Sequence, residues 1–406
     1  MAPFPQGRLT GGVLPPERGL VMTDNRTAMR TAGRVLPVRG GKGVDGALVV
    51  TLLLLLMAGL LTLFSATYYT AQDRGDPLSE VKKQLVGIGV GLVAMAVTSR
   101  ISYTFWKKPW VVLTGLGSSA VLLILVLIPG IGVYLNGSRR WLSIAGQSFQ
   151  PSELTKFAVV VFLATALTNG GDAVRSLFRG ILPLMVLPGF FFLVILEQPN
   201  LSTAMSILMV SGVMVLMAGA KWRHLTLLGA LGAVAGFFYA WSEPYRRERL
   251  LSFRDPFAKM SDEGYQLAQS LIAFGSGGLF GMGLGQGRQK YAYLPYPQSD
   301  FIFAIVGEDF GLFGCLAVIA LFVAFLFIGM RIAVTCRDKF GCLLAAGITA
   351  MISIQAFLNM GVAVGILPTT GLPLPFFSYG GTSISIMLAA VGILLNISRN
   401  CERNFG

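Results

Sequence analysis

The feature that most constrains this chain is a run of 59 residues, Phe340–Ser398, that contains no charged side chain. A helix needs about 20 apolar residues to cross the roughly 30 Å hydrocarbon core of a bilayer. This run is long enough for two such helices, and the prolines Pro368, Pro373 and Pro375 in its middle interrupt any continuous helix. The whole chain is 54% hydrophobic and 13% charged, against roughly 25% charged in soluble proteins. The sequence therefore predicts an all-α polytopic membrane protein.

Other hydrophobic segments recur along nearly the whole chain, beginning with 27 uncharged residues from Gly46. Charged or proline-rich breaks separate them. We expect a transmembrane domain over residues 46–400 with about ten helices: 46–68, 82–99, 110–132, 153–170, 180–197, 201–220, 225–241, 302–330, 341–365 and 381–398. The gap at 242–300, between the seventh and eighth helices, predicts one large periplasmic or extracellular loop.

The first 45 residues have seven basic and three acidic side chains, and they show no apolar periodicity. Such a composition predicts a disordered basic tail. If this tail is cytoplasmic and the helices alternate in direction, the inner segments hold 19 Lys and Arg residues and the short outer segments hold six. Because cytoplasmic loops carry an excess of basic residues, we expect both termini in the cytoplasm. The same rule accounts for the net charge of +13 without a nucleic-acid partner.

The four cysteines, Cys315, Cys336, Cys342 and Cys401, show no metal-ligand spacing. All four fall within predicted helices or on the predicted cytoplasmic side, so we expect free thiols and no metal site. The single histidine, His224, lies in a short basic loop. Catalysis centred on a histidine is therefore not expected.

Arg140 opens a polar motif on the predicted outer side that extends to Lys156. Arginine offers a rigid fork of donors suited to phosphate. Ser152 is predicted to cap the next helix, on which Glu153 and Lys156 would share a face. Two interpretations stay open. Either Arg140, Glu153 and Lys156 bind a substrate, or Glu153 and Lys156 form an intrahelical ion pair while the arginine anchors the helix.

The segment EQPN at 197–200 breaks the hydrophobic pattern at the same predicted face. Its proline exposes backbone groups that must face water or protein. Glu197 beside this break is a candidate to bind a substrate hydroxyl or Lys156. The alternative is a tight turn between two helices, with no further role for the carboxylate.

The long loop contains two candidate binding segments. In residues 244–257, basic and apolar residues alternate as in a helix lying on a membrane surface. Arg246 and Arg249 would contact a lipid-linked phosphate there, or would simply anchor the loop to headgroups. Further on, Gln266 and Ser270 fall on a predicted partly buried helix, which would need a polar cavity beside it.

Asp300 stands where this loop meets the eighth predicted helix. An acid at a membrane boundary is costly and is therefore a candidate functional residue. The alternative is a carboxylate that caps the N-terminus of the helix. Glu308 and Asp309 lie about two turns further in, and their simplest interpretation is a set of polar helix-packing contacts.

Five segments together resemble the SEDS family (shape, elongation, division and sporulation) of bacterial membrane proteins. They are YLNGSRRWLSIAGQSFQPSELTK, YRRERLLSFRDPF, GYQLAQSLIAFGSGGLFGMGLGQG, SDFIFAIVGEDFG and LPTTGLPLPFFSYGGTS. They occur in the family's order and cover about residues 50–400. PYRRER, LPTTGLPLPFFSYGG and the basic tail are closer to the division members than to the elongation members.

This resemblance implies a peptidoglycan glycosyltransferase of the bacterial inner membrane that polymerises lipid II into β-1,4 glycan strands at the division septum. It implies a class B penicillin-binding protein and other division proteins as partners. The family's essential aspartate falls on Asp300, and its outer arginine, glutamate and lysine fall on Arg140, Glu153 and Lys156. The segment LPYPQSD departs from the family, in which a charged or histidine-containing segment is expected before the aspartate.

The expected mechanism is a single inverting displacement on a lipid diphosphate sugar. Asp300 would be the general base for the acceptor hydroxyl. Arg140 and Lys156, with Arg246 and Arg249, would stabilise the departing diphosphate. A divalent cation such as Mg²⁺ or Mn²⁺ would share that role, although no acid cluster in the sequence identifies its site. Two other functions stay open: a lipid II flippase and a non-catalytic scaffold for division enzymes.

Overall fold

The computed structural model describes residues 43–72, 75–135, 138–144, 147–242, 247, 253–258, 264–291, 293–369 and 371–403. Almost all of the tail predicted to be disordered lies outside the described residues. So do Arg246 and Arg249, the two candidate phosphate contacts of the long loop.

Ten helices in the described part of the chain coincide with the ten predicted hydrophobic segments. They are α2 (Gly46–Gln72), α3 (Ser79–Arg100), α4 (Pro109–Leu127), α5 (Pro151–Asn169), α6 (Leu182–Leu196), α7 (Leu201–Met217), α8 (Trp222–Ser242), α11 (Ile302–Thr335), α12 (Lys339–Ala363) and α13 (Gly381–Arg403). Short turns connect some of them: η1 (Tyr103–Lys107) between α3 and α4, and η2 (Gly171–Arg175) and η3 (Leu177–Ile181) between α5 and α6.

Eight segments of the described chain are long and apolar enough to cross a membrane, and α7 is a shorter apolar helix of 17 residues. The chain is therefore a multi-pass membrane protein. Ten crossings and two cytoplasmic termini stay predictions.

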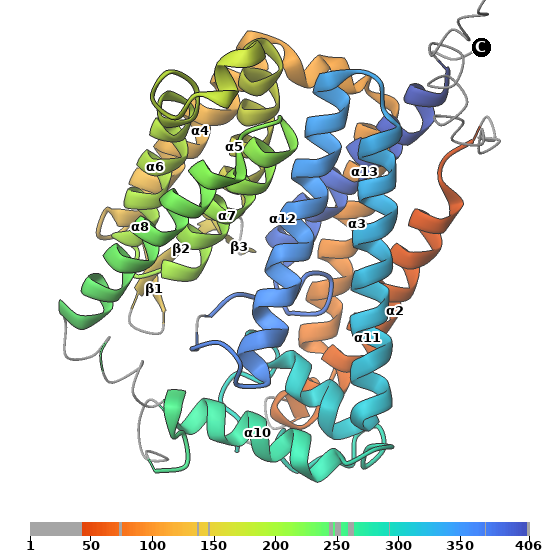
Figure 1. The fold of residues 1–406 in the computed structure, drawn as a ribbon. Helices are drawn as coiled ribbons and strands as arrows, with labels where there is room; N and C mark the ends of the chain where they lie inside the picture. The colour runs from red at the N-terminus through yellow and green to blue at the C-terminus, as the bar shows by residue number, and fades with distance from the viewer. Residues whose placement is uncertain are drawn as a thin grey trace, which may run out of the picture. The chain divides into compact units, whose positions relative to one another are not determined.

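Helix α12 lies at the centre of the packing (Figure 1). It contacts α5 and α7 on one side and α11 and α13 on the other. Its apolar stretch is 78% buried, the highest share among the helices that are long and apolar enough to cross a membrane. Gly347 permits this close packing, because a Cβ there would lie 2.7 Å from Val160 of α5 and 2.8 Å from Met214 of α7. Small residues allow the same close approach between membrane helices in general.

Helices α3 and α13 also pack closely through small residues. A Cβ on Gly87 would lie 2.7 Å from the Cα of Gly381. Hydroxyl groups bridge the two helices at this separation: Ser385 Oγ donates to the carbonyl of Gly87 at 2.9 Å, and Thr98 Oγ1 donates to the carbonyl of Ala389 at 2.8 Å.

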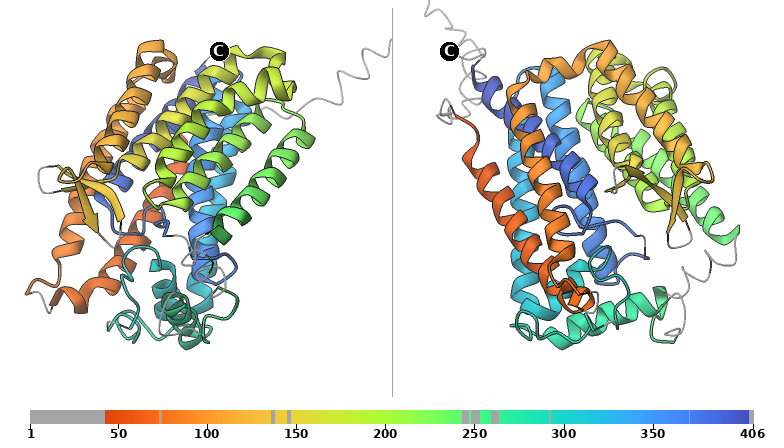
Figure 2. Two further views of the ribbon diagram at one scale, coloured as in Figure 1. Left: turned by 90° about the vertical axis from the view of Figure 1, so that its left-hand side faces the viewer. Right: turned by 180° about the vertical axis from the view of Figure 1, so that it is seen from behind.

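A three-stranded antiparallel sheet between α4 and α5 was not predicted. Its strands are β1 (Gly132–Leu135), β2 (Ser138–Ile144) and β3 (Gln147–Phe149), in the order β1-β2-β3. Helix α4 ends at Leu127 rather than near 132, because Pro129 and Gly130 follow it. Figure 2 shows the sheet toward the same end of the helices as α10 (Tyr265–Gly277).

The expected cap of α5 was also wrong. The helix begins at Pro151, and Gln150 occupies the N-cap position without a side-chain hydrogen bond. The hydroxyl of Ser152 is buried inside the first turn and has no hydrogen-bond partner among the described residues. Proline at the first helical position explains the shift, because its fixed backbone and missing N–H suit that position.

The glycine-rich loop after α10 packs against a break in α11. Gly311 has φ +66°, and a Cβ there would lie 2.4 Å from the backbone nitrogen of Gly281. Backbone hydrogen bonds cross between the two segments: Met282 N–H donates to the carbonyl of Glu308 at 2.9 Å, and Leu312 N–H donates to the carbonyl of Gly278 at 2.9 Å. The loop therefore supplies bonds for backbone groups that the broken helix leaves open.

Glu308 and Asp309 join this loop to the helices. The Lys290 ammonium lies 2.9 Å from Asp309 Oδ1 and donates to Ser65 Oγ of α2 at 2.8 Å, and both charged side chains are fully buried. Ser65 in turn donates to Asp309 Oδ2. The Glu308 carboxylate accepts the backbone N–H of Arg288 at 2.6 Å. Both acids thus make polar packing contacts, which is the interpretation given in the sequence analysis.

One expectation about the cysteines was wrong. Cys315 and Cys342 are free, whereas Cys336 is disulfide-bonded. Spacing along the chain carries no information about which side chains the fold brings within bonding distance, so this pairing could not be predicted.

We predict that Lys290→Met lowers the free energy of unfolding by about 3–5 kcal/mol, because it leaves Asp309 buried without its cation. Thermal unfolding of the detergent-solubilised protein measures this as a fall in apparent Tm. The double variant Lys290→Met/Asp309→Leu should recover most of the loss. Lys82→Met, which breaks the exposed pair of Lys82 with Asp76, is the control and should leave Tm unchanged. An equal fall in apparent Tm for Lys290→Met and Lys82→Met would contradict the prediction.

Candidate functional site

The candidate site forms where β2, the segment before α11 and the loop 364–380 meet. Asp300 precedes the N-cap residue of α11, Phe301, and this helix end has no side-chain cap bond. Asp300 thus lies one residue before the N-cap position, and its alternative role as a cap of α11 stays a prediction. It is partly exposed, and a Cβ on Gly371 would lie 3.3 Å from its Oδ2 and 4.0 Å from Nη1 of Arg140. The structure thus brings Asp300 and Arg140 to the same point of the 364–380 loop.

Arg140 is held by the turn between α6 and α7. Its Nε donates to the carbonyl of Gln198 at 3.0 Å, and its Nη2 donates to the carbonyl of Pro199. The turn is itself fixed, because the side chain of Gln198 donates to the carbonyl of Leu123 at 3.1 Å. The proline break predicted at this position therefore does present backbone groups, and they orient the guanidinium.

Glu197 does not contact Lys156, one of the two partners expected of it, and its binding of a substrate hydroxyl stays a prediction. Its side chain is exposed, and Lys156 contacts other residues. The backbone of the turn contributes to the site instead of its carboxylate. A tight turn was the alternative interpretation of this segment, and it fits the structure.

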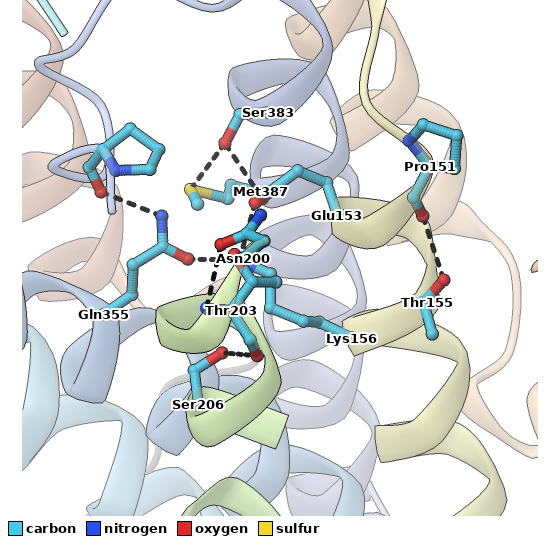
Figure 3. A network of polar contacts seen from close by, with 11 residues as sticks. Pro151, Glu153, Thr155, Lys156, Asn200, Thr203, Ser206, Gln355, Ser383 and Met387 are labelled. Atoms are coloured by element: carbon cyan, nitrogen blue, oxygen red, sulfur yellow. Dashed lines mark hydrogen bonds and ion pairs between the residues drawn. The ribbon is translucent and has the colours of Figure 1, made fainter. Parts of the chain in front are cut away.

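Glu153 and Lys156 form a buried ion pair on α5, with 2.7 Å between Nζ and Oε1 (Figure 3). Only 1% and 3% of their side chains are exposed. The pair reaches two other helices: Ser383 Oγ of α13 donates to Glu153 at 3.0 Å, and Lys156 donates to Gln355 Oε1 of α12. The intrahelical ion pair, one of the two interpretations of this motif, is therefore present, and it also links three helices.

The remaining candidates lie apart from Asp300 or outside the described residues. Gln266 is partly buried on α10. Ser270 of the same helix is fully buried, and its hydroxyl donates to the carbonyl of Ala363 at 2.7 Å, which ties α10 to the end of α12. This bond gives Ser270 a packing contact.

A side chain of α3 and the backbone of the segment before α11 hold the second half of the loop 364–380. Gln84 of α3 donates to the carbonyl of Ser378 at 3.1 Å and accepts the N–H of Gly380 at 3.1 Å. The N–H of Tyr379 donates to the carbonyl of Gln298 at 2.8 Å. Burial, together with the neighbouring Glu80, raises the pKa of Tyr379 to about 12, so its hydroxyl keeps its proton at neutral pH.

The family model of the cell cycle proteins FtsW, RodA and SpoVE matches residues 46–403. The chain belongs to this family. The resemblance inferred from the five sequence segments is thereby confirmed.

Individual relatives match this chain over most of its length. The chain is 42% identical to stage V sporulation protein E of Bacillus subtilis (strain 168), over 87% of this chain and 97% of that protein. It is 41% identical to the probable peptidoglycan glycosyltransferase FtsW of Geobacter sulfurreducens (strain DL-1 / KN400), over 86% of this chain and 94% of the relative.

Solved structures share the fold. A chain in a structure described as "Structural coordination of polymerization and crosslinking by a peptidoglycan synthase complex" matches with a TM-score of 0.73 and 29% identity, covering 88% of this chain and 98% of the other. The rod shape determining protein RodA of Thermus thermophilus matches with a TM-score of 0.63 and 27% identity, covering 88% and 97%.

Two residues of this FtsW/RodA/SpoVE protein lie at the centre of the site and were missed by the sequence analysis. Gln355 donates to the carbonyl of Pro373 at 2.9 Å, and Asn359 donates to the carbonyls of Asp300 at 2.7 Å and Leu372 at 2.6 Å. The available signal was two amide side chains spaced i, i+4 within an uncharged helix. Polar side chains in such positions generally hydrogen-bond across helices or line a polar site.

Proposed function

We propose that this protein is a peptidoglycan glycosyltransferase that polymerises lipid II into β-1,4 glycan strands during septal cell-wall synthesis. The observation that carries the proposal is the shared position of Asp300 and Arg140 beside Gly371. Family membership supports it, as does the name of the Geobacter relative, a probable peptidoglycan glycosyltransferase. A partly exposed carboxylate next to an arginine suits proton removal beside a departing phosphate.

The reaction is one inverting displacement. Asp300 removes the proton from the acceptor 4-hydroxyl, and that oxygen attacks the anomeric carbon of the donor. The bond from this carbon to the diphosphate oxygen breaks, and the α linkage becomes β. The diphosphate leaves with the electron pair of that bond, and its charge is stabilised by Arg140.

The other candidate residues have more distant roles. Lys156 is buried and bound to Glu153 and Gln355. It therefore acts on the leaving group at a distance, through the electrostatic effect of its positive charge and through the positions of Glu153 and Gln355. The described residues contain no group of three or more His, Cys, Asp or Glu side chains that could hold a metal ion. We therefore assign no step to a divalent cation.

The proposed partner is a class B penicillin-binding protein at the division septum, together with other division proteins. The support for it is the solved peptidoglycan synthase complex, one chain of which has this fold. In such a pair the strands made by one protein are crosslinked by the other.

A lipid II flippase is the second candidate function. It would need charged groups inside the bundle that are available to a moving headgroup. Glu308 and Asp309 are buried acids of α11 that would be candidates for this role. Both are bound to the loop 288–290, in contacts that fix the structure. A scaffold without catalysis would leave the shared position of Asp300 and Arg140 beside Gly371 without a role.

We predict that Asp300→Ala and Asp300→Asn reduce the rate of strand formation by about 10²–10⁴-fold, because each removes the base. The measurement uses purified lipid II and detergent-solubilised protein with its penicillin-binding partner, whose transpeptidase is blocked. Size-exclusion profiles and apparent Tm serve as controls for folding. A fully active Asp300→Asn enzyme would remove Asp300 from the chemistry. Inactive wild type that translocates lipid II in sealed vesicles would favour the flippase.

A pair of glycine variants tests the geometry around Asp300. Gly371 and Gly365 have nearly the same φ, +74° and +73°, but a Cβ on Gly365 would meet only leucine side chains. Alanine at either position should cost about 1–2 kcal/mol of stability from left-handed backbone strain. Only Gly371→Ala should also slow polymerisation, because its methyl group crowds the Asp300 carboxylate. Equal activity in the two variants would contradict this arrangement.

A further inference from the structure

The stretch of the loop 364–380 around Leu372 and Pro373 has few backbone donors of its own. Its sequence around Gly371 is rich in proline, and Pro368, Pro373 and Pro375 have no N–H to donate. Carbonyl groups of such a segment are costly when they are buried without a donor. We therefore expect donors for the carbonyls of this stretch to come from neighbouring elements.

Helix α12 supplies these donors from two positions one turn apart. Gln355 donates to the carbonyl of Pro373 at 2.9 Å, and Asn359 donates to the carbonyl of the preceding residue, Leu372, at 2.6 Å. Residues spaced i, i+4 lie on the same face of a helix. Two consecutive carbonyls of the loop are thus fixed against one face of the most buried helix.

Each amide also makes a second hydrogen bond, and its partner is a charged candidate residue. Gln355 Oε1 accepts from the Lys156 ammonium, and Asn359 Nδ2 donates to the carbonyl of Asp300 at 2.7 Å. The other atom of Asn359, Oδ1, is buried and has no partner among the described residues. Both partners of its Nδ2 are carbonyl oxygens, so the opposite orientation of this amide would place oxygen against oxygen.

Neither amide can reach a substrate in this structure. The side chain of Gln355 is 0% exposed and that of Asn359 is 1% exposed. Any effect on a reaction must pass through the groups that they hold.

We infer that Gln355 and Asn359 are positioning residues that set the separation between the Lys156 ammonium and the Asp300 carboxylate, using the loop carbonyls of Leu372 and Pro373 as the link. This inference rests on the proposed glycosyltransferase function for its effect on rate. Its structural part, that the two amides hold the loop, is independent of that function.

The main test is Asn359→Asp, which keeps the size of the side chain but replaces the donor with an oxygen facing two carbonyls. Displacement of a catalytic group by about 1 Å typically costs on the order of 10²-fold in rate. We expect kcat for strand formation to fall by about that factor with little change in KM, the pattern of an interaction that matters mainly in the transition state.

The chain offers a matched control, Asn396→Asp on α13. Asn396 is 1% exposed and also bridges two backbone groups: it donates to the carbonyl of Ser99 at 2.8 Å and accepts the N–H of Tyr103 at 2.9 Å. It lies 13 residues from Ser383, which is about 20 Å along the helix. This variant should lose stability without the selective fall in kcat.

Hydrogen–deuterium exchange of the loop gives a readout that does not depend on activity. Amides of residues 371–378 should exchange faster in Asn359→Asp than in wild type, and they should be unchanged in Asn396→Asp. Gln355→Glu should also loosen this segment, because it keeps an acceptor for Lys156 and loses the donor to Pro373.

The outcomes separate the two proposals. If wild type makes no strands, the proposed function fails, and exchange still decides whether the amides hold the loop. Unchanged exchange in both Asn359→Asp and Gln355→Glu would overturn the inference. So would a rise in KM with normal kcat, which would mean that the amides affect binding instead of placement.

Discussion

Buried carbonyl groups of the non-helical segments around the site impose the constraint on which this structure depends. Hydrocarbon offers no hydrogen-bond partner, so every such group needs a donor from the protein itself. The loop 364–380 meets this need with the buried side chains of Gln355 and Asn359 on α12 and of Gln84 on α3. The glycine-rich loop meets it through backbone bonds to the break in α11. The path of these non-helical segments is therefore determined by the helices that they pack against.

Two buried ion pairs add to this arrangement: Glu153 with Lys156, and Asp309 with Lys290. Such pairs contribute little net stability, because removing two charges from water offsets most of their attraction. Each pair has further partners on other elements, Ser383 and Gln355 for the first and Ser65 for the second. An alternative packing would leave a charge unpaired inside the bundle. The pairs therefore favour one relative placement of the helices that carry the site.

The helices could be predicted because hydrophobic length is a property of the sequence alone, and all ten segments are helical. Asp300 and Arg140 could be identified from the sequence because a charged side chain near a membrane is costly and is therefore a candidate functional residue. The three-stranded sheet was missed because its polar residues suggested a loop and its short strands gave little alternation. Contacts were the weakest part of the prediction. Glu197 was expected to bind a substrate hydroxyl or Lys156, and the contact with Lys156 is absent. The carbonyls of its turn orient Arg140 instead, because the orientation of a side chain at a turn follows from packing that the sequence does not display.

The amides of α12 were missed for a related reason, because a neutral polar residue in an apolar run carries no charge to mark it. The structure separates two classes of residue by exposure: Asp300 and Arg140 are partly exposed, whereas Lys156, Gln355 and Asn359 are buried. A group that exchanges a proton with a substrate needs access, and a group that fixes geometry is most effective where its rotamer is locked by packing. The buried polar residues of this protein therefore need not line the path of a substrate. Their contacts suit an enzyme whose chemistry takes place at the partly exposed Asp300. They are less suited to a transporter, in which Lys156 and Lys290 would have to release their carboxylates during each cycle.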